Sequence, residues 1–203
     1  MKSIFTTLLI FAVTHVFAQI PSPGAMPEKA IVLNGAIAHI GNGEVMENAA
    51  IGIENGKITF VKPSGSVKLN PEEADIIDVT GKHVYPGFIS PNNTLGITEV
   101  DAVRASRDYS ETGLFKPEVR AITAFNTDSR ISPTVRSNGV LITQATPRSG
   151  RICGTSSVMH LDGWNWEDAV LKEDDGIHLN WPSRFRRTGW WAEPGPTKPN
   201  KNY

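Results

Sequence analysis

The sequence predicts an α/β protein that begins with a small β-domain, and three observations support this class. Between residues 30 and 83, short apolar runs alternate with Asn-Gly and Gly-rich turns, as in a small antiparallel sheet or sandwich. From Val84, a Pro-Gly break leads into an apolar run that ends in a polar cluster at residues 90–94. A helical segment that ends at Asn138-Gly139 then leads into a second apolar strand from Val140.

Composition excludes several classes of protein and site. The chain has 203 residues and a formal net charge of -1, so it is long enough for one or two domains and offers no basic surface for nucleic acid. Cys153 is the only cysteine, which excludes an internal disulfide and a cysteine zinc cluster. We expect Cys153 to be a small buried residue.

The N-terminus carries the three parts of a secretory signal peptide. Met1-Lys2-Ser3 is a basic start, residues 4–16 are mostly apolar, and Val16-Phe17-Ala18 provides a cleavage site before Gln19. We therefore predict a signal peptide over residues 1–18, and a periplasmic or secreted chain with no transmembrane segment after its removal. The alternative is a buried N-terminal helix. Residues 19–29 form a Pro-rich leader.

The β-domain is expected over residues 30–83. Its strands follow turn signals, beginning with two short strands about a tight turn at Asn34-Gly35 and continuing through residues 49–53, 58–61 and 76–79. His39 and His83 fall within this domain. We predict that each is a partly buried strand residue rather than a metal ligand, because neither has a partner at metal-ligand spacing.

Residues 97–125 contain a charged stretch followed by an apolar one. The charged part, residues 97–114, is interpreted either as a polar substrate-binding cluster or as a solvated face with paired charges. Residues 117–125 have apolar side chains at helical spacing, which predicts a core-facing helix.

The segments from residue 132 onward are predicted mainly from their caps and glycines. Ser132-Pro133 begins a helix, and residues 140–144 form a buried strand. The remaining expectations are a Gly-rich loop at residues 147–158, a short helix capped by Asn165 through Leu171, a turn at Asp174-Asp175-Gly176, and an unstructured end at residues 193–203. The five tryptophans, between Trp164 and Trp191, are predicted to await a packing partner or to form a ligand platform.

The stretch from Gly81 to Gly96 resembles a signature of the amidohydrolase superfamily of metal-dependent hydrolases, which includes imidazolonepropionases. In that family a Gly-Lys turn leads into Pro-Gly-Phe-Ile-Asp, then His-x-His, then Leu-Gly. The matching residues are Pro86, Gly87, Phe88, Ile89, Leu95 and Gly96. Ser90 stands at the aspartate position, and Asn92 and Thr94 stand at the two histidine positions. The order of the turns before this stretch and the helix-Gly-strand step at Val140 resemble the family as well.

The resemblance implies a small β-domain followed, over residues 84–192, by the first part of a TIM-like (β/α)8 barrel. A complete barrel takes about 250 residues, so the barrel is expected to be incomplete, and the family's later metal ligands lie on strands beyond this chain. The chain is then an N-terminal fragment. Its implied partners are the missing C-terminal half or a paralogous amidohydrolase.

The family hydrolyses C-N bonds other than peptide bonds in small molecules, with zinc or another divalent metal. Amide and hydroxyl oxygens are poor substitutes for imidazole toward zinc, so Asn92 and Thr94 are expected to hold no metal. We assign no catalytic residue, and the candidate pocket is Asn92, Asn93, Thr94 and Gln144. The alternatives are a non-catalytic ligand-binding or partner subunit of an active paralogue, and an unrelated β-rich exported binding protein.

Overall fold

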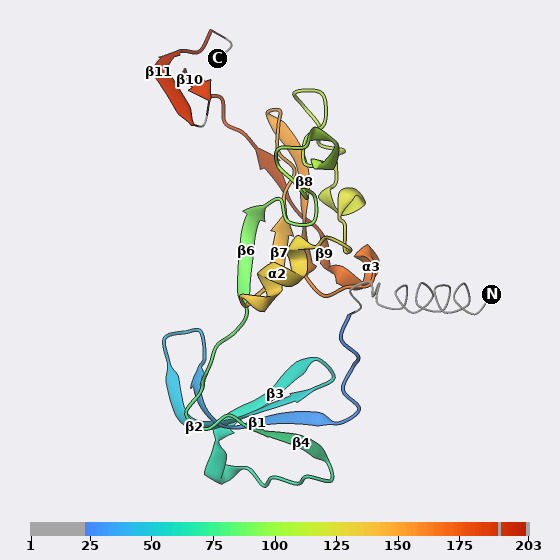
Figure 1. Cartoon of the computed structure of the whole chain (residues 1–203), viewed down its shortest axis with the longest axis vertical. Helices are drawn as coiled ribbons and strands as arrows, with labels where there is room; N and C mark the ends of the chain where they lie inside the picture. Colours follow the sequence, from blue (N-terminus) through green and yellow to red (C-terminus); the bar gives the residue numbers. More distant parts are fainter. Residues whose placement is uncertain (1–22, 191, 202–203) are drawn as a thin grey trace, which may run out of the picture. The chain divides into compact units, whose positions relative to one another are not determined.

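A computed structural model describes residues 23–190 and 192–201. The chain divides into a β-unit, residues 23–88, and a second unit that includes residues 89–201 (Figure 1). The predicted signal peptide and the first residues of the predicted leader lie outside the described residues.

The β-unit is a single mixed sheet rather than the predicted sandwich. Its strand order is β3-β2-β1-β4, and β5 also pairs with β1. β1–β2 and β2–β3 are antiparallel, whereas β4 and β5 run parallel to β1. The strands are β1 (Ala30–His39), β2 (Val45–Glu54), β3 (Lys57–Pro63), β4 (Ala74–Asp78) and β5 (His83–Val84), with a 3-10 turn η2 (Ser64–Ser66) after β3. The core is made of three alanines and one isoleucine, Ala36, Ala38, Ala49 and Ile51.

The Asn34-Gly35 pair does not form the predicted turn. β1 continues through it, and the register with β2 shifts between Asn34 and Ala36, which makes a β-bulge. Gly35 has a φ of +82°, and a Cβ on it would lie 2.4 Å from the Thr80 hydroxyl oxygen. The Asn55-Gly56 pair does form a tight turn between β2 and β3, with both residues at positive φ.

The boundary between the units lies later than the predicted start at Val84. Val84 pairs with Ala38 and so belongs to the sheet of the β-unit. The next strand, β6 (Phe88–Asn93), begins after Pro86-Gly87. Because proline has no backbone N–H to donate, Pro86 interrupts the extended segment, and β5 and β6 belong to different sheets.

The second unit is built on a four-stranded sheet of order β6-β7-β8-β9 (Figure 1). The strands after β6 are β7 (Val140–Ala145), β8 (Ile152–His160) and β9 (Val170–Leu179). β8 is antiparallel to both of its neighbours. The predicted Gly-rich loop is therefore wrong for residues 152–158, which lie in β8, and the predicted turn at Asp174-Asp175-Gly176 is wrong because β9 runs through it.

Helices are short in this unit. α2 (Ile131–Ser137) begins one residue before the predicted Ser132 cap, and α3 (Trp166–Ala169) is capped by Asn165 as predicted but ends before Leu171. The predicted helix over residues 117–125 is reduced to the 3-10 turn η4 (Ala121–Ala124), and η3 (Arg104–Ser106) is a second such turn. The apolar residues still reach the core, which contains Ile97, Ala121, Ile122, Phe125, Ala145, Met159, Leu161 and Ala169.

The predicted unstructured end from residue 193 is also wrong for residues 193–199. They form β11 (Glu193–Pro199), which pairs antiparallel with β10 (Phe185–Trp190). Within residues 23–190 and 192–201, no helix has the length and apolar character needed to cross a membrane.

Candidate functional site

The carboxyl ends of β6 and β7 lie together. Thr146 N donates to Asn93 O (2.8 Å), and Thr143 Oγ1 donates to Asn93 Oδ1 (2.7 Å). Asn93 is the last residue of β6, Thr143 lies in the second half of β7 and Thr146 directly follows it, so the two strands run in the same direction. Polar side chains from both strands therefore meet where the carboxyl ends of β6 and β7 lie side by side. We call this place the β6–β7 edge.

Asn93 is the central residue of the β6–β7 edge. Its side-chain nitrogen donates to Ser90 O (2.7 Å) and Ser90 Oγ (2.6 Å), and its oxygen accepts from Leu95 N (2.9 Å) as well as from Thr143. Thr143 is fully buried, so its hydroxyl depends on this bond. Asn93 thus has a structural role in joining the strands.

Asn92 is held by its backbone. Its N–H donates to Gln144 Oε1 (2.9 Å), and its carbonyl accepts from Arg148 Nη2 (2.5 Å). Its φ is +47°, a left-handed conformation that asparagine tolerates better than most residues. The side chain of Asn92 is exposed, and Thr94 is half-buried and begins the next turn by accepting from Ile97 N (3.1 Å).

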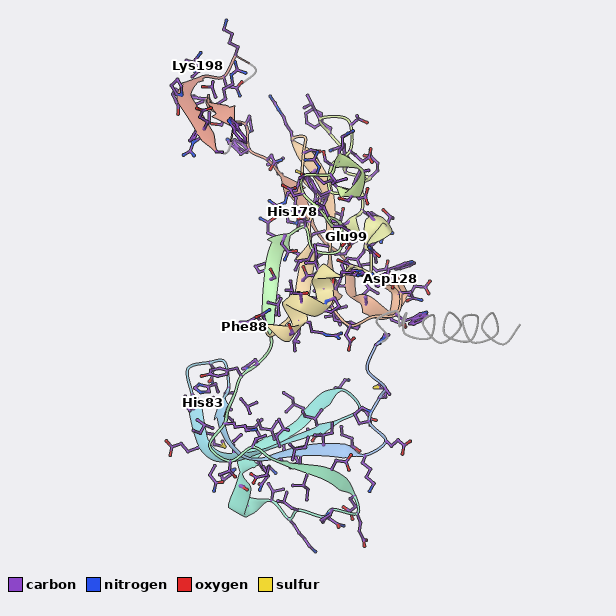
Figure 2. All side chains as sticks on the ribbon, in the orientation of Figure 1. His83, Phe88, Glu99, Asp128, His178 and Lys198 are labelled. Atoms are coloured by element: carbon purple, nitrogen blue, oxygen red, sulfur yellow. The ribbon has the colours of Figure 1, made fainter. Side chains whose placement is uncertain are left out.

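Gln144 links this edge to β9. Its amide nitrogen donates to Asp175 Oδ2 (2.5 Å), and Lys172 Nζ lies 3.0 Å from Asp175 Oδ1. The bonds from the Lys172 ammonium and then from the Gln144 amide lower the pKa of Asp175. His178, also on β9 (Figure 2), has a lowered pKa because burial and the positive charge of Arg148 disfavour its protonation, while Asp175 opposes them.

Three residues around this edge were not predicted: Arg148, Asp175 and His178. The two β9 residues reach it because β8 and β9 pair with Ser156 opposite Gly176 and Gly154 opposite His178. The sequence is typical of loops at both places: Gly154 follows Cys153 on β8, and β9 contains the triplet Asp174-Asp175-Gly176. Nothing local in the sequence indicates this strand pairing.

The residues at the β6–β7 edge do not fit a zinc site of the hydrolase kind. A catalytic zinc takes three nitrogen, thiolate or carboxylate ligands and one open position. Asn92, Thr94 and Gln144 offer amide and hydroxyl oxygens, and Asp175 is already engaged by Lys172 and Gln144. In the described part of the chain, no three His, Cys, Asp or Glu residues are grouped so as to hold a metal ion.

The charged stretch at residues 97–114 supplies internal contacts through Glu99. The Glu99 carboxylate accepts from Asn126 Nδ2 (3.0 Å) and Ser129 Oγ (2.9 Å). Figure 2 shows Glu99 near the turn that contains Asp128. This residue therefore fastens the loop after β6 to the turn before α2, and it is not free to bind a polar substrate.

In the β-unit, His39 and His83 both lie on strands as predicted; His39 is half-buried, but His83 is exposed rather than partly buried. His39 Nε2 lies 2.9 Å from His83 Nδ1. The two residues are 44 positions apart in sequence, so a search for closely spaced ligands misses them.

Comparison with known proteins connects this fold to one superfamily. A curated imidazolonepropionase from Bacillus thuringiensis (strain Al Hakam) is 45% identical over 51 residues, 25% of this chain, and one from Bacillus mycoides (strain KBAB4) is 43% identical over 51 residues. The crystal structure of an amidohydrolase from Thermotoga maritima MSB8 matches with a TM-score of 0.68 at 22% identity, over 75% of this chain. The chain is related to the amidohydrolase superfamily over part of its length.

These matches cover only part of each relative's length. The matched region is 12% of the length of the curated imidazolonepropionases and 39% of the Thermotoga maritima amidohydrolase. No protein-family model matches the chain. The structural match concerns the fold, and the β-rich architecture with few helices agrees with the predicted amidohydrolase-type β-domain.

Proposed function

We propose that this chain is the N-terminal part of an exported amidohydrolase-type protein and that by itself it does not hydrolyse C-N bonds. The observation that carries the proposal is the set of side chains and hydrogen bonds at the β6–β7 edge. Asn92 and Thr94 occupy the positions where the family motif has histidines. The backbone N–H of Asn92 is bonded to Gln144 and its carbonyl to Arg148. These groups provide neither imidazole ligands nor an activated nucleophile.

The same proposal takes β6 and β7 as the first two strands of an incomplete (β/α)8 barrel. Their parallel arrangement supports it. β6 lies at one end of the sheet order, so one of its edges has no neighbouring strand among the described residues. Phe88 and Ile89 on β6 are 64% and 61% exposed. A further barrel strand would cover such an edge, and a (β/α)8 protein completed in this way takes a small-molecule substrate.

A second candidate function is a non-catalytic binding or partner subunit of an active amidohydrolase paralogue. The exposed apolar side chains of the second unit favour it, because large apolar side chains left in water are typical of surfaces that contact another protein. They include Leu114, Phe115, Leu171, Ile177, Leu179 and Trp181. In this version the paralogue supplies the metal site.

The experiment is an assay of the purified chain, with and without added zinc, on imidazolonepropionate and simple cyclic amides. We expect no turnover above the buffer rate, with an active imidazolonepropionase as positive control. Turnover by the chain that disappears in D175N or H178Q would contradict the proposal. Co-expression with an amidohydrolase paralogue followed by size-exclusion chromatography separates the two versions, because only the second expects a complex of the two polypeptides.

A further inference from the structure

The β-unit brings two histidines and a tyrosine to one face of its sheet. His39 is the last residue of β1, and His83 lies on β5, where it pairs with Ile37 (His83 is labelled in Figure 2). Residues two apart on a strand face the same side, and so do paired residues on neighbouring strands. His39 and His83 therefore share one face, and Tyr85, just after β5, reaches it through its ring contacts with both histidines.

The rings of these three residues are in contact. His39 Nε2 and His83 Nδ1 are 2.9 Å apart, and the ring centroids are 5.2 Å apart. The Tyr85 ring stacks on His39 at a centroid distance of 4.0 Å with an interplanar angle of 13°. His83 is exposed and His39 half-buried, and the stacked Tyr85 ring limits rotation of the His39 ring.

We infer that His39 and His83 form a two-histidine site for Cu²⁺ or Ni²⁺. Imidazole nitrogens bind such ions at about 2.0–2.1 Å, and two nitrogens at that distance lie about 2.9 Å apart when they occupy neighbouring positions at about 90°. A tetrahedral angle requires a separation of about 3.3 Å. The observed 2.9 Å is the length of the hydrogen bond in the empty site, and both nitrogens can bind one ion at an angle of about 90° without moving apart.

The empty state of the site is a hydrogen bond in which one facing nitrogen carries a proton and the other accepts it. For a metal ion to bind, that proton moves to the other nitrogen of its own ring, and both facing nitrogens then present lone pairs. Because no cluster of three His, Cys, Asp or Glu residues exists in the described chain, water completes the coordination. The ion is therefore exchangeable. The site does not depend on the proposed function.

The test is titration of the purified chain with Cu²⁺ and with Ni²⁺, followed by calorimetry and, for Cu²⁺, by electron paramagnetic resonance. We expect one ion per chain with two nitrogen ligands in the copper spectrum. H39A and H83A should each weaken binding about tenfold or more, and the double variant should lose it. Tyr85→Phe, which keeps the stacked ring, should bind as the unmodified chain does.

H160A and H178A serve as matched controls, since each removes one histidine outside the site and should leave binding unchanged. Circular dichroism shows whether each variant has kept its fold. Binding of one ion with full affinity by the folded H39A/H83A double variant would overturn the inference. So would loss of the ion in H160A or H178A.

Discussion

At the scale of single residues, the β6–β7 edge depends on hydrogen bonds that only certain side chains provide. The candidate pocket predicted from the sequence is Asn92, Asn93, Thr94 and Gln144. In the structure the Asn92 N–H bonds to Gln144 and Asn93 bonds to Thr143, whereas Thr94 begins the next turn. The sequence does not indicate the bonds of Arg148 to Asn92, of Asp175 to Gln144 or of His39 to His83. The bonded residues are 56, 31 and 44 positions apart, and spacing rules detect only ligands that are close in sequence.

Replacing Asn93 should destabilise the second unit. N93A removes the acceptor of the buried Thr143 hydroxyl and the donor to Ser90, so we expect a loss of about 1–3 kcal/mol in the free energy of unfolding. Urea unfolding measures it. N92G is the matched control: glycine adopts the positive φ of Asn92 readily, and the change should stay within about 0.5 kcal/mol. Equal losses in both variants would contradict the role of Asn93.

His178 should make stability depend on pH. Burial, followed by the charge of Arg148, lowers its folded-state pKa below the ordinary 6.5. As pH falls, His178 therefore takes up its proton in the unfolded chain before it does so in the folded one. The contribution of His178 to stability is constant above a pH of about 6.5 and is lost between about 6.5 and the lowered pKa. The urea midpoint should fall over this window, and less steeply in H178Q. Identical slopes in the two proteins would show that His178 is not responsible.

At the scale of elements, several errors of prediction occur where glycine has a role other than ending a strand. Asn34-Gly35 makes a bulge within β1, and Gly154 lies inside β8, because close neighbours at each place leave no space for a Cβ. The apolar strands β6 and β7 and the Asn165 cap were predictable, since they depend on local pattern and local hydrogen bonds. The pairing of β8 with β9 was not.

Gly154 and Gly176 lie on neighbouring strands and should respond differently to alanine. Gly154 has a φ of +121°, and a Cβ there would lie 2.5 Å from Val119 O, so G154A should cost about 2–4 kcal/mol in the free energy of unfolding. Gly176 faces open space, and G176A should change it by no more than about 0.5 kcal/mol. Thermal or urea unfolding compares the two. A tolerated G154A would show that β8 does not pass so close to Val119.

At the scale of the whole molecule, both units leave large apolar side chains exposed. The β-unit has a small core of its own, as the resemblance implied. The second unit leaves Trp181 80% exposed, together with Ile89 on β6 and Leu171, Ile177 and Leu179 on β9. Single exposed apolar side chains are common on folded domains, whereas a contiguous apolar patch is typical of a surface that contacts another segment or protein. The exposed residues of β6 and β9 therefore support the proposal only together with the parallel arrangement of β6 and β7.

The export prediction also belongs to this scale. The basic start, the apolar run and the Val16-Phe17-Ala18 tripeptide predict cleavage between Ala18 and Gln19. N-terminal sequencing of the protein recovered from the periplasm or medium should begin at Gln19. A sequence that begins upstream of residue 15 would contradict it.

The measurement that tests the central claim most directly is the zinc content of the chain after dialysis against trace zinc, made on H39A/H83A so that only the second unit can hold the metal. If the β6–β7 edge lacks the ligands of an amidohydrolase, no zinc should remain above the buffer blank, because amide and hydroxyl oxygens do not replace imidazole. Retention of about one equivalent, lost again in H178A or D175N, would show that this edge is a metal centre.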